Sequence, residues 1–326
     1  MRAIVQPGMA AHTDEDQRAL MAAAQAGDER AFRRLVEPHR RALEVHCYRM
    51  LGSVQDAEDV LQETLLRAWR SLERFERRSS VHTWLYRIAT NACLDELERR
   101  PRRPAVVQPY PDFRLEDLPA PIADPAARYA LREGLELAFL AAIQELPARQ
   151  RAVLILRDVL GWTAREAADL LETTVTSVNS SLQRARATID AAGVEAHAVA
   201  PRATHERRLL ARYMEAWEAS DMDAFLALLR DDAVLRMPPG RAVAGAQDVG
   251  RFWFVEPKSD GRCSVATTRL VPTRANGRPA VIVYKRRPDG VEERFGVMTL
   301  EIDGDRIAGF DAFLDPELVR TFEGGG

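Results

Sequence analysis

Apolar and polar positions recur with a helical period through residues 56–72. The apolar positions would share one face of a helix, and they are Ala57, Val60, Leu61, Ala68, Trp69 and Leu72. Another face would carry Asp59, Gln62, Glu63 and Arg70. The pattern therefore predicts an amphipathic helix with an acidic and amide surface.

A short polar segment, 73–80, separates this helix from a second one. Its single aromatic residue, Phe75, is expected to be exposed, and Ser80 is suited to cap the next helix. That helix is predicted from Val81 to about Arg99, with apolar positions at Leu85, Ile88, Ala89 and Ala92. Roughly one other face would carry Trp84, Arg87, Asn91 and Asp95.

Helical periodicity also precedes these two helices. It begins at Asp16, breaks at Gly27-Asp28 and ends at Gly52, whereas residues 1 to about 14 are expected to be disordered. Packing of these helices on one another predicts an all-helical domain over 15–100.

Prolines change the character of the chain between residues 101 and 125. The segment contains seven prolines. Because they remove backbone donors and fix φ, no helix is expected to run through it. We predict an extended linker, which also carries the acidic pair Glu116-Asp117.

Helical periodicity resumes over residues 126–192. Pro147 lies where a helix can restart, since proline is tolerated in a first turn. Two short helical stretches, 163–171 and 175–189, flank a turn and give a helix-turn-helix pattern.

Three polar residues are placed to cap these two helices. Thr163 and Glu166 have the spacing of a capping box at the first helix. Thr174 precedes the second helix and is expected to be its N-cap.

A third unit with a different sequence pattern occupies residues 204–326. It opens with an amphipathic helix whose apolar positions are Leu209, Leu210, Tyr213, Met214 and Trp217. A short helix over 222–229 follows, and then strand-like runs separated by turn signals, Asn276-Gly277 among them. Helices followed by an antiparallel sheet predict an α+β cone.

Composition restricts the functions open to the chain. The net charge of -3 excludes a uniformly basic DNA binder, so DNA contacts would have to come from local arginines. Cys47, Cys93 and Cys263 are far apart and lack paired ligand spacing, which argues for a reducing compartment and against a disulfide or structural zinc. Without a long apolar run or a signal-peptide core, the protein is expected to be cytoplasmic, with no membrane contact.

Two motifs resemble those of a known family. DAEDVLQETLLRAW at 56–69 and SSVHTWLYRIATNACLD at 79–95 resemble region 2 of bacterial extracytoplasmic-function (ECF) sigma factors. The helix-turn-helix resembles region 4 of the same family. The last unit is similar to the SnoaL-like (NTF2-like) domain of one ECF branch, which includes the actinobacterial SigG-type subgroup.

This resemblance implies a multidomain fold and a promoter-recognition function. The fold would be two all-α sigma domains, a region 2 helical bundle and a region 4 helix-turn-helix, followed by the α+β cone. The function would be that of an RNA polymerase sigma factor that directs promoter-specific transcription initiation. The implied domains are region 2 at 15–100, the linker at 101–125, region 4 at 126–192 and a regulatory SnoaL-like domain at 204–326.

The resemblance implies core RNA polymerase and promoter DNA as partners. Polymerase would contribute its flap and the clamp coiled coil of its largest subunit. The family docks region 2 on that coiled coil, and the matching positions here are Asp59, Gln62 and Glu63. The alternative is an ordinary solvated helix surface. The acidic linker could imitate DNA in a basic polymerase channel, as family linkers do, or be a plain solvated tether.

Region 2 would open the -10 element and capture an unstacked base, with stacking and phosphate charge supplying affinity. The candidate contacts are Phe75, Arg77, Arg78, Ser79, Ser80, Trp84, Arg87 and Asn91. Trp84 could instead be a core residue, and the two loop arginines could simply be solvated.

Region 4 would place the start of its second helix in the major groove at the -35 element. The candidate contacts are Thr176, Ser177, Asn179, Ser180, Gln183, Arg184 and Arg186. Ser181 stands where many family members have arginine, so the phosphate contacts and base preference of the family are not carried over to this helix.

The C-terminal unit leaves several functions open. Related folds include isomerases that place an acid and a base in an apolar pocket. The candidate pocket residues are Trp217, Asp232, Met237, Trp253, Tyr284, Asp311 and Phe313. No spacing singles out an acid–base pair, so we expect no enzyme activity, no cofactor and no metal. The favoured role is a regulatory contact with the sigma domains, and the alternative is a small-ligand sensor or an enzyme with DNA-targeting helical domains.

Two further expectations can be tested. A helix-turn-helix repressor, the remaining alternative, would bind duplex DNA without polymerase. Deletion of 204–326 is expected to change transcription rather than the folding of the helical domains. The linker lacks the Trp-Leu-Pro-Glu-Pro pattern of SigJ-like relatives. We therefore do not assign the autoregulation of those relatives in full to this chain.

Overall fold

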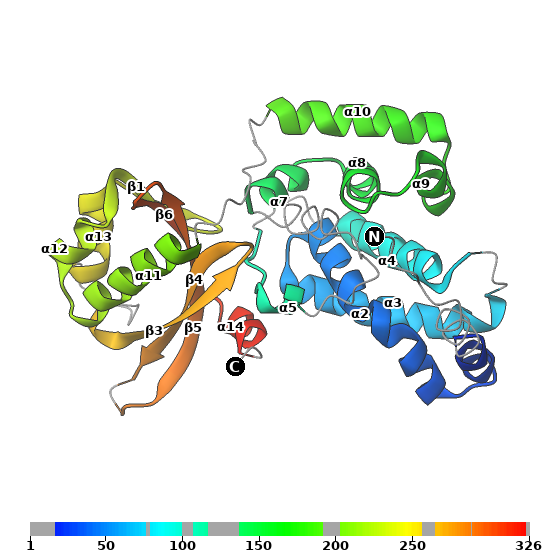
Figure 1. Cartoon of the computed structure of the whole chain (residues 1–326), viewed down its shortest axis with the longest axis horizontal. Coiled ribbons are helices and arrows are strands. Elements are labelled where there is room, and N and C mark those ends of the chain that lie inside the picture. The colour runs from blue at the N-terminus through cyan, green and yellow to red at the C-terminus, as the bar shows by residue number, and fades with distance from the viewer. Residues whose placement is uncertain are drawn as a thin grey trace, which may run out of the picture.

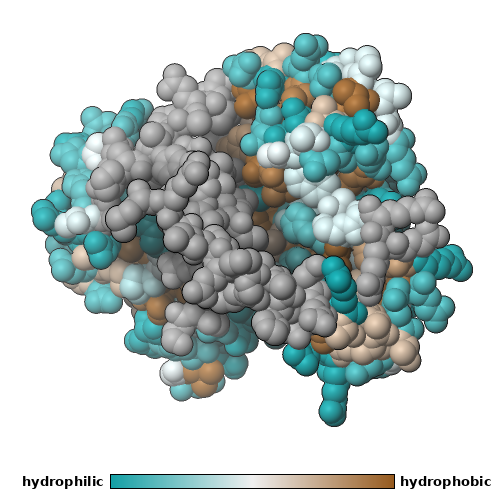
Figure 2. Space-filling view, turned by 45° about the vertical axis from the view of Figure 1, so that its right-hand side comes forward, coloured by the Kyte–Doolittle hydropathy of each residue, from teal (hydrophilic) through white to brown (hydrophobic). Residues whose placement is uncertain are grey.

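The computed structural model describes residues 17–75, 79–99, 107–116, 137–191, 203–255, 265–287 and 289–323. Two helical parts lie together, and a part containing a sheet lies beside them (Figure 1). The visible surface is mostly hydrophilic, with small separate hydrophobic patches (Figure 2). None of the helices in these ranges combines the length and apolar character needed to cross a membrane.

The first helical part packs three long helices on a short one over residues 17–25. Their bounds are α2 (Glu29–Leu51), α3 (Val54–Ser71) and α4 (Val81–Arg99), with a 3-10 turn, η1 (Leu72–Arg74), after α3. The side chain of Asp28 caps α2, and Gly52 ends it with a φ of 71°. The expected breaks at Gly27-Asp28 and Gly52 are confirmed.

The described part of the linker is a packed segment. Tyr110 is fully buried, and Val107, Pro109 and Pro111 are buried with it. One short helix, α5 (Phe113–Glu116), forms after Pro111, in a stretch free of proline. Because of this burial, 107–112 is not a solvated tether. The side chains of the acidic pair Glu116-Asp117 lie outside the described residues.

The second helical part contains the helix-turn-helix. Its elements are α7 (Leu137–Gln144), α8 (Ala148–Leu154), the π-helical turn η2 (Ile155–Val159), α9 (Ala164–Leu170) and α10 (Val175–Ala191). Pro147 is the N-cap of α8, as its position predicted. The capping box of Thr163 and Glu166 is present, and the Thr174 hydroxyl accepts from the backbone N–H of Ser177 at 3.1 Å. The three caps are therefore confirmed.

Arg151 joins the two helical parts. Its side chain is 5% exposed and donates to the backbone carbonyls of Met50, Gln144 and Leu146. The neighbouring Gln144 amide donates to the carbonyl of Arg49 at 3.0 Å. The last carbonyls of α2 thus find their partners in the second helical part, since a helix leaves them without intrahelical donors.

The C-terminal part is an α+β unit built on one six-stranded sheet of order β2-β1-β6-β5-β4-β3. The strands are β1 (Leu229–Met237), β2 (Arg241–Ala244), β3 (Thr268–Ala275), β4 (Arg278–Arg286), β5 (Glu292–Asp303) and β6 (Arg306–Phe313). The helices are α11 (Ala203–Glu218), α12 (Met222–Leu226), α13 (Ala246–Phe254) and α14 (Pro316–Phe322), with the 3-10 turn η3 (Val265–Thr267) before β3.

The sheet is mixed, which corrects the expectation of an antiparallel one. β1 pairs with β6 in parallel, whereas the other neighbouring strands are antiparallel. The sequence pattern does not predict β1 or β2, because charged residues interrupt the alternation in β1 and β2 is only four residues long. The β3–β4 hairpin does turn at Asn276-Gly277, where both residues have positive φ.

The two faces of the sheet belong to different cores, because side chains alternate along a strand. Val281 and Val283 of β4 pack with Tyr213 of α11 and other residues of α11–α13 in one cluster. Ala280 and Ile282 belong to a second cluster, which continues through α14 and the linker into both helical parts. The sheet is therefore the surface on which the sigma-like helices and the C-terminal unit meet.

Candidate functional site

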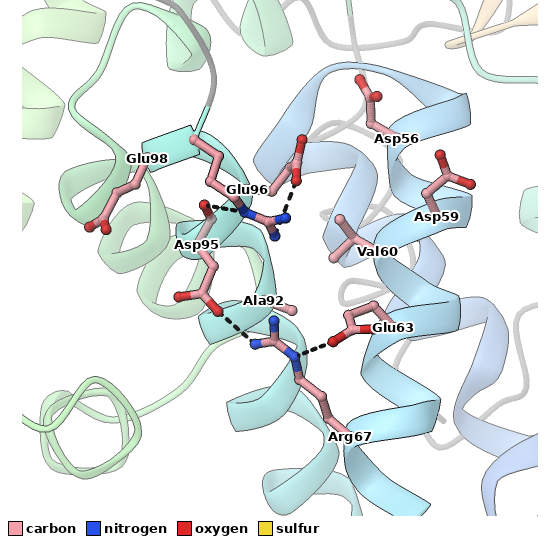
Figure 3. Close-up of a pocket in the computed structure, with 10 residues that line it drawn as sticks. Asp56, Asp59, Val60, Glu63, Arg67, Ala92, Asp95, Glu96 and Glu98 are labelled. Carbon is pink, nitrogen blue, oxygen red and sulfur yellow. Dashed lines mark hydrogen bonds and ion pairs between the residues drawn. The ribbon is translucent and has the colours of Figure 1, made fainter.

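An open groove of 780 Å³ runs between α3 and α4 (Figure 3). Its lining residues are Asp56, Asp59, Val60, Glu63, Arg67, Ala92, Asp95, Glu96, Glu98 and Arg99. The six carboxylates and two guanidinium groups among them give a formal charge of -6 + 2 = -4. Such a groove attracts basic partners and accelerates encounter with them.

Arg67 organises the centre of this groove. Its Nε donates to Glu63 at 2.8 Å and its Nη1 donates to Asp95 at 2.6 Å, so it ties α3 to α4 (Figure 3). The hydrogen bond from Arg67 lowers the pKa of Glu63 and keeps this carboxylate ionised. Asp59 and Gln62, the other two predicted docking residues, are exposed on α3.

The predicted exposure of Phe75 is wrong. The ring is 9% exposed and lies 4.7 Å from the Trp84 ring, which is itself 4% exposed. The amide of Gln25 donates to the carbonyls of Leu72 and Phe75 and fixes the chain after α3. In this arrangement neither ring is available to a base, and Trp84 is a core residue, the alternative given above.

Polar residues remain on the surface near this aromatic pair. Ser79 and Ser80 are exposed, and the Ser80 hydroxyl accepts from the backbone N–H of Thr83 at 3.1 Å, which confirms it as the cap of α4. Arg87 and Asn91 are exposed on α4. Arg77 and Arg78 lie outside the described residues.

The candidate -35 residues lie on one exposed side of α10. The exposed members are Thr176, Ser177, Asn179, Gln183, Arg184 and Arg186, and Ser180 is half-buried. The buried side of α10 carries Val178, Leu182 and Ala185. Arg186 is engaged by Asp158 in a two-point ion pair of 2.9 and 2.7 Å that raises the pKa of its guanidinium. Arg186 would have to leave Asp158 before it could contact a DNA phosphate.

The seven candidate pocket residues do not line one pocket. Trp217 and Trp253 are buried with their rings 5.2 Å apart, and Met237 packs against the same cluster. Tyr284 and Phe313 pack on the opposite face of the sheet, because their strand positions have the other parity.

The two acidic candidates are also engaged elsewhere. Asp232 is exposed and pairs with Arg230. Asp311 shares the strand face of Phe313 and accepts from the Nε of Arg236 at 2.6 Å. No acid–base pair is therefore brought into the aromatic interior among the predicted residues.

A contact that the sequence pattern does not predict joins the linker to the sheet. The backbone N–H of Tyr110 donates to the Asn276 side chain at 2.6 Å, and the backbone N–H of Asn276 donates to the Tyr110 carbonyl at 3.0 Å. The Asn276 amide also donates to the Tyr48 hydroxyl of α2, and the Tyr110 hydroxyl donates to Glu44 at 2.9 Å. We call these four residues the linker contact.

Comparison with known families covers each of these parts. The Sigma-70 region 2 family matches residues 35–103, and the Sigma-70, region 4 family matches residues 136–189. The SnoaL-like domain family matches residues 210–310. A curated relative, the ECF RNA polymerase sigma factor SigG of Mycobacterium tuberculosis (strain CDC 1551 / Oshkosh), is 41% identical over 322 residues, which cover 90% of this chain and 85% of the relative.

This chain belongs to the ECF sigma factor family. It is an RNA polymerase sigma factor with an additional SnoaL-like domain. The RNA polymerase sigma-H factor of Pseudomonas aeruginosa is 35% identical over 187 residues, which cover 55% of this chain and 95% of that protein.

A solved structure shares the fold of nearly the whole sigma factor. The crystal structure of the M. tuberculosis ECF sigma factor SigJ has a TM-score of 0.56 and 22% sequence identity. The match covers 86% of this chain and 96% of that one. The fold expected from the sequence, two all-α sigma domains and a C-terminal α+β unit, is confirmed.

Proposed function

We propose that this sigma factor docks on core polymerase through the acidic groove between α3 and α4. The observation that supports this docking is the net charge of the groove, to which both helices contribute. Asp59 is exposed at the α3 side of the groove, and Gln62 is exposed elsewhere on α3. The proposed partner is the clamp coiled coil of the largest polymerase subunit, which would contact the groove through basic residues. Arg67 would hold Glu63 in place for this contact.

Charge reversal of α3 tests this docking. The double variant Asp59→Arg, Glu63→Arg is expected to weaken association with core polymerase by about 100-fold, because like charges across an interface cost several kcal/mol. The measurement is a titration of labelled core enzyme. The matched control reverses two exposed acids on α11, Glu215→Arg and Glu218→Arg, and should bind like the wild type. Unchanged binding of the α3 variant would refute the proposal.

The same sigma factor is proposed to read promoter DNA at two places. Exposed Arg87 and Asn91 of α4, with Ser79 and Ser80, support a contact with the -10 element, in which arginine binds phosphate and asparagine a base edge. The exposed side of α10 supports a contact with the -35 element. Footprints on promoter DNA should require core enzyme, and a footprint of equal strength from the free protein would favour a repressor.

The SnoaL-like domain is proposed to restrain region 2 rather than to catalyse a reaction. The linker contact supports restraint, since it connects Glu44 and Tyr48 of α2 through Tyr110 to Asn276 of the β3–β4 turn. The engagement of Asp232 and Asp311 outside the aromatic interior supports a non-catalytic role. The small-ligand alternative predicts instead that a metabolite co-purifies with the domain.

Asn276→Ala tests the restraint. It removes the side-chain acceptor of the buried Tyr110 N–H and the donor to Tyr48, so the linker contact should open and run-off transcription at a fixed sigma concentration should rise severalfold. Asp305→Ala, in the exposed β5–β6 turn, is the matched control and should leave the yield unchanged. If Asn276→Ala transcribes like the wild type, the linker contact does not restrain initiation.

A further inference from the structure

Two histidines, one tyrosine and one tryptophan meet where region 4 touches region 2. The His82 ring of α4 lies 5.9 Å from His39 of α2 and 4.5 Å from Tyr86 of α4. Trp162, which follows η2, completes the group at 6.0 Å from His82 and 5.8 Å from Tyr86. We call His39, His82, Tyr86 and Trp162 the histidine junction.

The histidine junction is an interface between two parts of the chain. Trp162 comes from region 4 and is 9% exposed because it packs on rings of region 2. Arg157 donates to the Trp162 carbonyl and holds the tryptophan segment against η2. Separation of region 4 from region 2 would therefore expose Trp162, Tyr86 and His82 to water together.

The charged groups around this junction do not favour protonated histidine. From α2, His46 lies 5.0 Å from the Tyr86 ring, and burial together with the charge of Arg49 lowers the pKa of His46. From region 4, Asp158 and Glu166 are equally near Trp162 in sequence. Asp158 is paired with Arg186, and Glu166 is engaged in the capping box with Thr163. Among the described residues, no carboxylate contributes to the pKa of the three histidines.

Burial lowers the pKa of both histidines of the junction. Desolvation lowers the pKa of His82, and desolvation together with His82 lowers the pKa of His39. A charged ring could gain from the aromatic faces of Tyr86 and Trp162. Two charged rings 5.9 Å apart would repel each other. Neutral rings therefore suit the closed junction.

We propose that the histidine junction is a proton-sensitive contact that holds region 4 on region 2 at neutral pH and releases it on acidification. The consequence for initiation rests on the proposed function, since a sigma factor that reads two separated promoter elements needs its two DNA-binding regions to move apart. The release itself is a property of the free chain and does not depend on polymerase.

Proton linkage gives the direction of the pH effect on opening and the pH range in which it occurs. His82 is the histidine whose ring contacts Trp162 of region 4. Its pKa is lowered when the junction is closed, and we expect it to return toward the ordinary value, about 6.5, when region 4 leaves. The open form then binds more protons below about pH 6.5, so the closed form is favoured above this pH and loses stability as the pH falls. Between pH 7.5 and 5.5 His82 can shift the equilibrium toward the open form by up to about tenfold.

The test uses the full chain and measures opening directly. Small-angle X-ray scattering at pH 7.5 and 5.5 should show a larger radius of gyration at the lower pH, reversible on return to pH 7.5. The double variant His39→Phe, His82→Phe keeps aromatic rings but cannot be charged, and it should be equally compact at both values. The control His205→Gln, at an exposed histidine of α11, should open like the wild type.

A second measurement does not depend on the variants. The pKa of His82, followed by NMR in the full wild-type chain, should lie below 6.5. A pKa of 6.5 or above, no expansion of the wild type at pH 5.5, or an unchanged expansion of the double variant would overturn the proposal. Loss of polymerase binding in the α3 variant leaves these readouts unaffected, so the two proposals fail separately.

Discussion

His46 shows how a single buried residue sets the pH response of region 2. Its Nε2 lies 2.9 Å from the Thr90 hydroxyl and the ring is fully buried. Desolvation, with the charges of Arg49 and His82, lowers its pKa to about 3. His46 is therefore neutral in the fold, whereas in the unfolded chain it is protonated below about pH 6.5.

We predict from this pKa that region 2 loses stability on acidification. The unfolded state binds the additional proton, so the free energy of unfolding should fall by about 1.4 kcal/mol per pH unit between about pH 6.5 and 3. His46→Leu should reduce this slope in urea unfolding measured from pH 7 to 5, whereas His205→Gln should keep it. The prediction fails if His46→Leu and the wild type have parallel profiles.

At the scale of elements, the junction between the helical parts depends on one arginine. Arg151 of α8 supplies donors to three backbone carbonyls, one of them at the end of α2. Burial lowers the pKa of its guanidinium to about 10, which still leaves it charged at neutral pH. A cation at this place also interacts favourably with the C-terminal end of the α2 dipole.

Arg151→Met is expected to destabilise the closed arrangement. The aliphatic stem is kept, but buried carbonyls lose their donors at a cost of about 1–3 kcal/mol each. Thermal unfolding of the full chain measures the loss, with the exposed neighbour Arg149→Met as the control. Equal melting temperatures for the two variants would show that water or other groups replace these hydrogen bonds.

At the scale of the whole molecule, one apolar cluster runs from region 2 to the last helix. It contains Leu61 of α3, Tyr110 of the linker and Phe322 of α14. The Gln55 amide also donates to Asp315, just before α14, at 3.1 Å. The SnoaL-like domain therefore covers surface that region 2 would otherwise expose.

This shared core changes the outcome expected for truncation. Deletion of 204–326 should lower the melting temperature of the remaining helical part, because each large apolar side chain it uncovers costs about 1.5–3 kcal/mol. Fragment 1–195 should also bind more of a hydrophobic dye than the full chain. An unchanged melting temperature would restore the earlier expectation that only transcription responds to the deletion.

Local structure and family membership can be predicted from the amino-acid sequence alone. Helical periodicity, the caps at Ser80, Thr163 and Thr174, and the turn at Asn276-Gly277 depend on residues a few positions apart, so they can be read from the chain. The region 2 and region 4 motifs are equally local. Short or irregular elements such as β2 and α5 escaped prediction, because few residues carry their signal.

Which residues share a surface depends on how the helices and strands pack. Phe75 packs against Trp84 across the segment between α3 and α4. Tyr110 is hydrogen-bonded to Asn276, and His39 and His82 lie in one group with Trp162, although these positions are distant in sequence. The pocket set failed for the same reason, since strand parity and pairing separate Trp217 from Tyr284 and Phe313. Such contacts arise from the packing of whole faces, to which many weak interactions contribute and which no short motif records.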